Sequence, residues 1–159
     1  MSKKGKRKAE AGDVASNRRA SHKYELVERF EAGIELRGSE VKSLREGKTN
    51  IGDAYASIDD GEVWLRNAHI PPYDPASLDN HDPERPRKLL LHRYEIERLI
   101  ARMQRKNLTM VPTRIYFKGS RAKVELALAR GKEHADRRRE IKDRDIQREV
   151  ERDFRQRLK

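Results

Sequence analysis

The sequence predicts a mainly β protein, a small antiparallel barrel with peripheral helices and a charged segment at each end. Short runs of alternating apolar and polar residues recur through the middle of the chain. Turn-forming residues, more often than helices, separate these runs. Both ends hold too few apolar residues to join a core. We therefore expect three segments, residues 1–20, 21–130 and 131–159.

The charge balance indicates a polyanionic partner. The chain of 159 residues has a formal net charge of +11 and a pI near 10.0, which favours nucleic acid first and an anionic membrane second. No apolar run approaches the roughly 20 residues of a spanning helix, and no secretion signal is evident. Without cysteine the chain has no disulfide or thiolate zinc site, which fits a reducing compartment. We expect a soluble, cytoplasmic monomer that uses no membrane.

The first 20 residues are basic and nearly devoid of apolar side chains, so we expect disorder in the free chain and order from residues 21–24 onward. A solubilising tail and a flexible polyanion-binding arm remain equally open. Residues 24–37 then read as a strand with a bulge near residues 27–29. Its inner face is expected to carry Phe30, Ala32, Ile34 and Leu36.

A short helix follows over residues 39–46, with Ser39 as its cap and Gly47 as its end. Residues 54–58 and 62–66 flank Asp59-Asp60-Gly61, which predicts a hairpin. The acidic pair in that turn could be imagined as a metal site, but turn chemistry explains it more simply.

Five of the six prolines lie in residues 71–86, which predicts a surface excursion. Residues 92–106 carry the apolar stripe of an amphipathic helix. A second hairpin is expected around Lys118-Gly119-Ser120, with an edge or a bulge at Pro112. About six strands with two intervening helices favour an OB-like antiparallel barrel, because closure removes the sheet edges.

Residues 131–159 mix basic and acidic residues around a thin apolar series. Opposite charges three or four residues apart support a helix only weakly. We expect a tail that is partly disordered when free and helical when bound.

Catalytic motifs are absent from the sequence. The five histidines are scattered, Gly47-Lys48-Thr49 lacks the loop and first glycine of a phosphate-binding P-loop, and no nucleophile elbow occurs. Nucleic-acid features are stronger. Exposed rings such as His22 and Tyr24 could stack on bases, although packing at the barrel rim explains Tyr24 slightly better. Candidate phosphate contacts are Lys42, Arg45, Lys48, Arg87, Lys88, Lys118, Arg121 and Lys123.

The chain also resembles a known family. Asn17-Arg18-Arg19-Ala20, Glu31-Ala32-Gly33, the run E-V-K-S-L-R-E-G-K from Glu40 and Gly131-Lys132 are similar to small protein B, the SsrA (tmRNA)-binding protein family. The resemblance runs from about Asn17 to Arg144. It implies an OB-like barrel and a non-enzymatic role in trans-translation, in which the barrel binds the tRNA-like domain of tmRNA.

The resemblance also implies partners and site residues. The tail would enter the empty mRNA channel and decoding site of the small subunit of a stalled ribosome, and elongation factor Tu is a further candidate partner through aminoacylated tmRNA. No cofactor or metal is implied. The family contacts tmRNA at positions that match His22, Glu31, Leu91 and His92. The tail motif matches Gly131, Lys132, Asp136, Arg137, Arg138, Lys142 and Arg144.

One position departs from the family pattern, because Ala135 stands where an aromatic residue or histidine is usual and His134 precedes it. Arg137 replaces the usual lysine, which keeps the charge but changes the phosphate geometry. Glu31 cannot serve a phosphate, yet its carboxylate can accept hydrogen bonds from bases and 2′-hydroxyls. A structural ribosomal or assembly protein is the alternative from another class. A nuclease using Asp59, Asp60 and Glu62 is a distant third.

Overall fold

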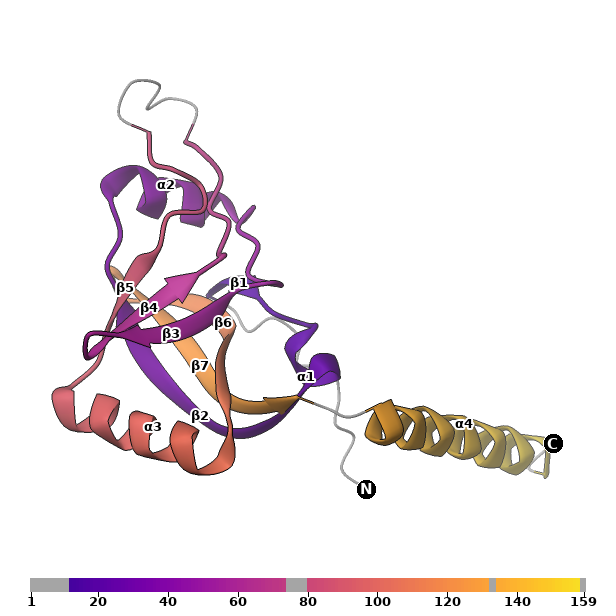
Figure 1. Cartoon of the computed structure of the whole chain (residues 1–159). Helices are drawn as coiled ribbons and strands as arrows, with labels where there is room; N and C mark the ends of the chain where they lie inside the picture. The colour runs from indigo at the N-terminus through magenta and orange to yellow at the C-terminus, as the bar shows by residue number, and fades with distance from the viewer. Residues whose placement is uncertain (1–11, 74–79, 132–133, 158–159) are drawn as a thin grey trace.

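A computed structural model describes residues 12–73, 80–131 and 134–157. Seven strands and four helices lie in these described ranges (Figure 1). In chain order they are β1 (Asp13–Ser16), α1 (Ala20–Lys23), β2 (Tyr24–Ile34), α2 (Gly38–Glu46), β3 (Tyr55–Asp59), β4 (Glu62–Arg66), β5 (Arg87–Leu90), α3 (Arg93–Lys106), β6 (Thr109–Lys118), β7 (Arg121–Gly131) and α4 (His134–Arg157).

The strands form a closed antiparallel barrel. Strand order runs β6-β3-β4-β5-β2-β7, and β7 pairs back with β6 to close the ring. The seventh strand, β1, adds to β6 from outside this ring. The prediction of a mainly β antiparallel barrel is confirmed, and the six strands expected from the sequence correspond in number to the closed ring.

Strand β2 pairs with β7 along most of its length and with β5 at its end. Its register shifts between Leu26 and Glu28, as the sequence predicts. Beyond this bulge Ala32 and Ile34 are buried in the core, whereas Glu31 and Glu35 are exposed. The two faces of β2 therefore follow the alternation in the sequence.

Both predicted hairpins are present. Asp60 and Gly61, at φ 50° and 74°, form the turn between β3 and β4, where paired positive φ angles match the right-handed twist of the strands. Gly119, at φ 64°, begins the two-residue turn between β6 and β7. The register of β6 shifts between Pro112 and Arg114, so the expected bulge at Pro112 is confirmed. Asp59 accepts a hydrogen bond from Arg66 at 2.5 Å, which satisfies a turn carboxylate without a metal.

The core fills the barrel, and helix α3 packs along it. Leu99 is buried, and Ile96 and Met103 pack against the same cluster, as the predicted stripe requires. A second, smaller cluster joins Ala20 of α1 with Val111 of β6 and with Ala127 and Ala129 of β7. Residues 71–73 and 80–86 form neither helix nor strand, which agrees with the predicted surface excursion.

The N-terminal boundary predicted at residue 20 is wrong for residues 13–20. Asp13–Ser16 forms β1 on β6, Ala15 is buried, and the Asn17 side chain donates a hydrogen bond to the Pro112 carbonyl at 3.0 Å. A four-residue strand needs little apolar content of its own because its partner strand supplies the surface. Residues 1–11, for which an arm is predicted, lie outside the described residues.

The start of α2 also differs from the prediction. The helix begins at Gly38, where the backbone N–H of Arg37 donates to Glu40 Oε2 at 2.9 Å. Ser39 instead shares a 2.9 Å hydrogen bond with His81 Nδ1. Gly47 ends the helix at φ 79°, as predicted. Within the described ranges, none of the helices is both long enough and apolar enough to span a membrane.

Candidate nucleic-acid interface

A row of paired residues crosses the outer face of four strands. Leu90 on β5 lies opposite Gly33 on β2, which lies opposite Lys123 on β7, which in turn lies opposite Tyr116 on β6. Directly opposed residues project from the same face of a sheet. Glu31 projects from this face two residues before Gly33. The barrel thus brings together Glu31 and Lys123. The sequence predicts each as an RNA contact but does not show that they are neighbours.

Glu31 is exposed, but its carboxylate has protein partners. The hydroxyl of Tyr116 donates a hydrogen bond to Oε2, and the Lys118 ammonium lies 3.8 Å from Oε1. Burial and the hydrogen bond to Glu31 raise the pKa of Tyr116, so the phenol remains a donor at neutral pH. Each carboxylate oxygen has a second lone pair. Tyr116 can therefore orient Glu31 while leaving it able to accept from a ligand.

A charged network lies beside Glu31 on this face. Arg114 donates from Nε to Glu125 Oε2 at 3.0 Å and from Nη1 to Asp13 Oδ1 at 3.0 Å, and Arg29 donates to Glu125 Oε1 at 3.3 Å. The Arg114 guanidinium also lies 4.5 Å from the centre of the Tyr116 ring. Burial alone would raise the pKa of Glu125, but bonds from Thr113 and Arg114 leave it below its ordinary value. These fixed charges hold the Tyr116 ring, and through it Glu31.

Leu91 and His92 lie at the end of β5, next to this row. Leu91 packs partly against the core. His92 is exposed and is the N-cap of α3, where its backbone N–H donates to Glu95 Oε2 at 2.9 Å. Because Leu90 pairs with Gly33, the chain that follows Leu90 runs alongside the part of β2 that carries Glu31. The structure therefore groups Leu91 and His92 with Glu31 and Lys123.

His22 and Tyr24 lie at the opposite end of β2. Tyr24 pairs with Gly131 and packs partly against the small cluster under α1, which agrees with the packing interpretation of this ring. His22 is exposed in α1. Seven residues separate Tyr24 from Glu31, roughly 23 Å along a strand. A ligand that touches both ends must therefore be long, and the end at Tyr24 is the one from which α4 leaves the barrel (Figure 1).

The predicted cations on α2 face outward beside aromatic rings. The Lys42 ammonium lies 5.6 Å from the centre of the Tyr73 ring, and the Arg45 guanidinium lies 4.4 Å from that of Phe117. Lys48 is exposed just after the helix. Contacts of this kind hold a side chain in place without neutralising its charge. These residues thus remain accessible to phosphate.

Arg87 is not a phosphate contact, so that part of the sequence interpretation is wrong. Its side chain is 0% exposed, and it donates to Glu40 Oε1 at 3.1 Å and to the Ala68 carbonyl at 2.8 Å. Glu40 is also fully buried, and Arg85 donates to both of its oxygens at 2.6 and 2.7 Å. The adjacent Lys88 is half-buried and pairs with Glu62 at 2.9 Å. Arg87 therefore points into the interior and Lys88 to the surface, because successive side chains of a strand such as β5 project to opposite faces.

The buried pair predicts acid-sensitive stability. Burial alone would raise the pKa of Glu40, but hydrogen bonds from Arg85 and the Arg37 backbone, with the charge of Arg87, bring it below its ordinary value of 4.5. Such a group adds stability above its unfolded pKa and loses it as pH falls through the folded one. We expect the free energy of unfolding to decrease below about pH 4.5, with a weaker decrease in Glu40→Gln. Urea titrations across this range measure both, and equal slopes would contradict this role.

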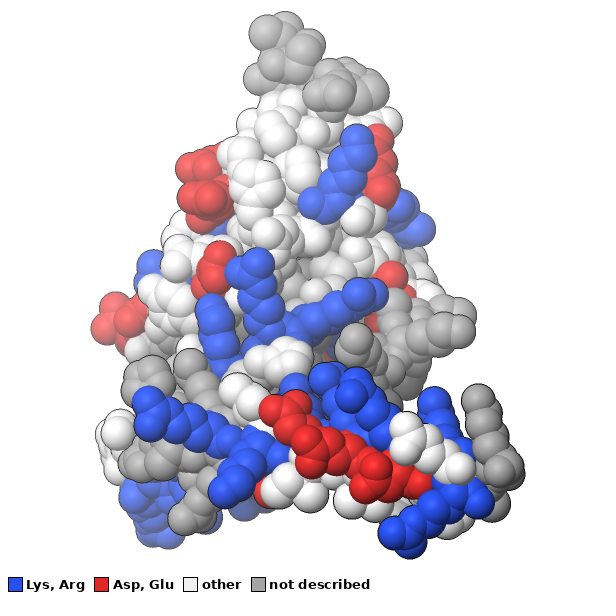
Figure 2. All heavy atoms as spheres, turned by 90° about the vertical axis from the view of Figure 1, so that its right-hand side faces the viewer, with Lys and Arg blue, Asp and Glu red and all other residues white. Residues whose placement is uncertain are grey.

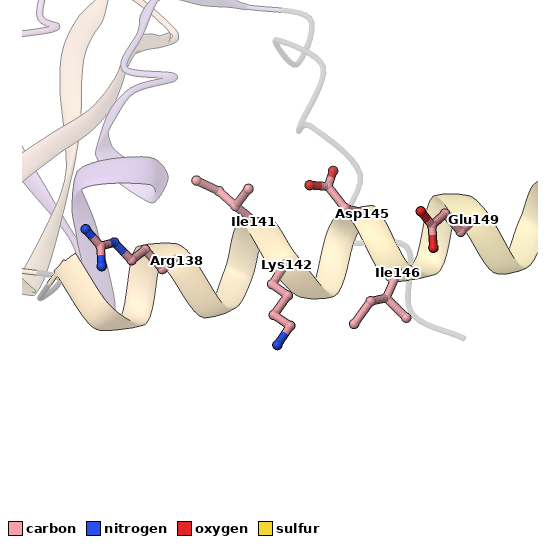
Figure 3. Close-up of a pocket in the computed structure, with 6 residues that line it drawn as sticks. All are labelled: Arg138, Ile141, Lys142, Asp145, Ile146 and Glu149. Carbon is pink, nitrogen blue, oxygen red and sulfur yellow. The ribbon is translucent and has the colours of Figure 1, made fainter.

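The tail forms α4, which projects from the barrel (Figure 1). Arg138, Lys142 and Arg144 are exposed on it, as are Ile141, Ile146, Val150 and Phe154. Figure 3 shows Ile141 and Ile146 pointing to different sides of the helix, with Lys142 and Asp145 beside them. Gly131 ends β7. Lys132 lies outside the described residues, as do the side chains of Asp136 and Arg137.

An isolated peptide of residues 131–159 is expected to show little helix in buffer. Its exposed apolar residues give α4 no packing energy, and charge pairs contribute only about 0.2–0.5 kcal/mol each. Far-ultraviolet circular dichroism measures this directly, and the intact protein serves as the control for total helix. A stably helical peptide would contradict folding on binding.

The face from which α4 projects suits an extended polyanion. Figure 2 shows lysine and arginine side chains across the centre and base of the face from which α4 projects, with acidic side chains interleaved toward the base. Among the described residues no cluster of three His, Asp or Glu could hold a metal ion. The arrangement can hold phosphates, accept hydrogen bonds through Glu31 and stack rings at His92.

Three contributors escape sequence reasoning. Tyr116, Arg114 and Glu125 look like ordinary outward residues of the two strands of one hairpin. The only signal for these three residues is hairpin register, which places residues 114 and 116 opposite residues 125 and 123.

The fold and this surface define a small basic barrel protein with an exposed, charged tail. The SmpB protein family model matches residues 14–156. An SsrA-binding protein from Mycobacterium sp. (strain KMS) is 56% identical over 92% of this chain and 87% of its own length. An SsrA-binding protein from Mycobacterium tuberculosis (strain ATCC 25177 / H37Ra) is 55% identical over 92% of this chain and 91% of its own length.

A solved structure gives the same result. A chain of the structure described as "tmRNA-SmpB: a journey to the center of the bacterial ribosome" is 51% identical, covers 76% of this chain and 85% of its own length, and superposes with a TM-score of 0.64. The chain belongs to the SmpB protein family.

Proposed function

We propose that this protein is an RNA-binding adaptor of trans-translation, which binds the tRNA-like domain of tmRNA and delivers it to stalled ribosomes. The observation that carries this proposal is the identity above 50% to SsrA-binding proteins over nearly the whole chain, together with the likeness to a tmRNA-SmpB structure. The protein acts in the cytoplasm and catalyses no reaction. Elongation factor Tu joins the complex through aminoacylated tmRNA.

The barrel supplies the tmRNA contacts. Glu31 accepts hydrogen bonds from base or ribose groups, and Lys123 with the α2 cations Lys42, Arg45 and Lys48 holds phosphates. Leu91 and His92 extend the same surface past β5, and Lys88 lies on its far margin. His22 and Tyr24 contact the RNA toward the end of the barrel from which the tail leaves. Positive charge gives affinity in this arrangement, and Glu31 gives selectivity.

The tail supplies the ribosome contact. Gly131 and Lys132 begin it, and Asp136, Arg137, Arg138, Lys142 and Arg144 line its first turns in sequence. As a helix, residues 134–157 span roughly 36 Å, long enough to enter the empty mRNA channel and occupy the decoding site. The exposed apolar side chains of α4 then find partners that the free protein lacks.

Binding of the full chain to the isolated tRNA-like domain tests the proposal. We expect a dissociation constant well below that for a ribosomal RNA hairpin of equal length at the same salt concentration. Equal affinities would favour the alternative of a structural ribosomal or assembly protein, which binds RNA without preference for tmRNA.

Glu31→Gln is expected to weaken binding of the tRNA-like domain by about 5- to 150-fold, the worth of one well-placed base contact. A purely electrostatic role predicts the opposite, since the substitution removes a negative charge from an RNA-binding surface. Fluorescence anisotropy measures the change. Glu149→Gln, which removes an exposed carboxylate from α4 outside the barrel surface, is the matched control, and unchanged affinity in Glu31→Gln would remove Glu31 from the interface.

A further inference from the structure

The start of α3 presents two aromatic rings, His92 and Tyr94, of which the proposed contacts include only His92. The rings of His92 and Tyr94 are stacked, with centres 5.6 Å apart and planes 9° from parallel. Tyr94 is 68% exposed, the most exposed large hydrophobic residue of the described chain. At this exposure the Tyr94 ring contributes little to the core and is accessible to a ligand.

The backbone holds this pair in place. His92 is the N-cap of α3, and the Glu95 carboxylate accepts its backbone N–H at 2.9 Å while the His92 carbonyl accepts from Ile96 at 3.1 Å. Leu99, one turn further on, anchors the helix in the core. The two rings are therefore organised before any ligand binds, which lowers the entropic cost of stacking a further ring on them.

The position of the pair indicates its ligand. Leu90, two residues before His92, is 52% exposed and lies opposite Gly33, in the row that leads to Lys123. Between the two aromatic residues, the Arg93 side chain is 93% exposed, with a 3.5 Å ion pair to Glu97. Stacked rings next to an exposed cation are the elements with which proteins bind an unpaired base and its phosphate.

We propose that Tyr94, backed by His92, is a stacking platform for one unpaired nucleobase of the bound RNA. The inference rests on the proposed function and adds to it a residue and a mode of contact. The base stacks on the open face of the Tyr94 ring, and Arg93 holds the adjoining phosphate. Because every base has a flat face, this contact strengthens binding without reading sequence, in contrast to Glu31.

Affinity measurements on the full chain with the isolated tRNA-like domain test the platform. Tyr94→Ala and Tyr94→Leu should weaken binding by roughly 5- to 150-fold, whereas Tyr94→Phe should stay close to the wild type. Tyr55→Ala, which removes another exposed tyrosine at the start of β3, is the matched control. The loss in Tyr94→Ala should be the same at low and high salt, while Arg93→Ala should flatten the salt dependence.

The outcomes separate the two proposals. If the wild type binds the tRNA-like domain and Tyr94→Ala binds within about twofold of it, the platform is wrong and the proposed function stands. Tyr94→Leu that binds like the wild type would also overturn stacking, since it would show that any apolar side chain suffices. If the wild type itself fails to bind this RNA, the proposed function is wrong and so is the ligand assigned to Tyr94. Unchanged urea midpoints in the variants exclude misfolding as the cause.

Discussion

A chain that ends at Gly131 is expected to bind tmRNA as the full chain does and to lose peptide tagging on stalled ribosomes by ~10²-fold or more. Residues 132–159 carry eleven Lys and Arg against eight Asp and Glu, so their removal takes away only +3 of the +11 net charge. The barrel and its outer face end before this cut. The truncated chain loses the contact of its tail with the ribosome. We expect that contact to act together with the attachment through tmRNA, because two linked contacts bind far more tightly than one.

Two assays check this division of labour. Anisotropy with the tRNA-like domain measures the first step, and a reconstituted tagging reaction on ribosomes stalled without a stop codon measures the second. A full-length variant with a Gly/Ser linker in place of residues 132–159 is the control for length and should fail in tagging as the truncation does. Loss of tmRNA binding on truncation would contradict separate roles for barrel and tail.

Glu40→Ala is expected to destabilise the fold by about 3–5 kcal/mol, because it leaves the buried Arg87 guanidinium without its carboxylate. That is a large part of the roughly 5–15 kcal/mol by which small domains are stable. Glu40 also accepts from Arg85 and from the Arg37 backbone, so the substitution loosens α2 from β5 and from residues 82–87. Lys42 and Arg45 then lose their fixed position.

Urea denaturation followed by the fluorescence of Trp64, the single tryptophan, measures the effect. Glu46→Ala removes an exposed carboxylate from the last position of the same helix and should change stability by no more than about 0.5 kcal/mol. A loss below about 1 kcal/mol in Glu40→Ala would show that water accepts the Arg87 hydrogen bonds in place of the carboxylate, and that the pair does not fix α2.

Much of the barrel could be predicted from the sequence because its signals are local. Asp60-Gly61 and Gly119-Ser120 dictate tight turns, the alternation around Ala32 and Ile34 fixes the buried face of β2, and Pro112 marks a bulge. The features that could not be predicted depend on contacts between residues far apart in the sequence. Strand β1 exists only because β6 offers it an edge, and no property of residues 13–16 alone indicates a strand.

The candidate site shows the same division. Family resemblance placed Glu31, Leu91 and His92, but their convergence follows from pairings between strands far apart in sequence. Arg87 and Lys88 look alike in the sequence, and only the barrel shows that one is buried with Glu40 and the other is half-exposed. Likewise the partner of Glu31, Tyr116, lies 85 residues away.

Recovery of the RNA bound to the protein in cells tests the central claim most directly. The full chain is purified after crosslinking, and the attached RNA is sequenced. An adaptor of trans-translation should carry tmRNA as the dominant species, with reads concentrated in its tRNA-like domain and reduced in Glu31→Gln. Recovery of general ribosomal RNA without enrichment of tmRNA would contradict the proposal and indicate a structural ribosomal or assembly protein.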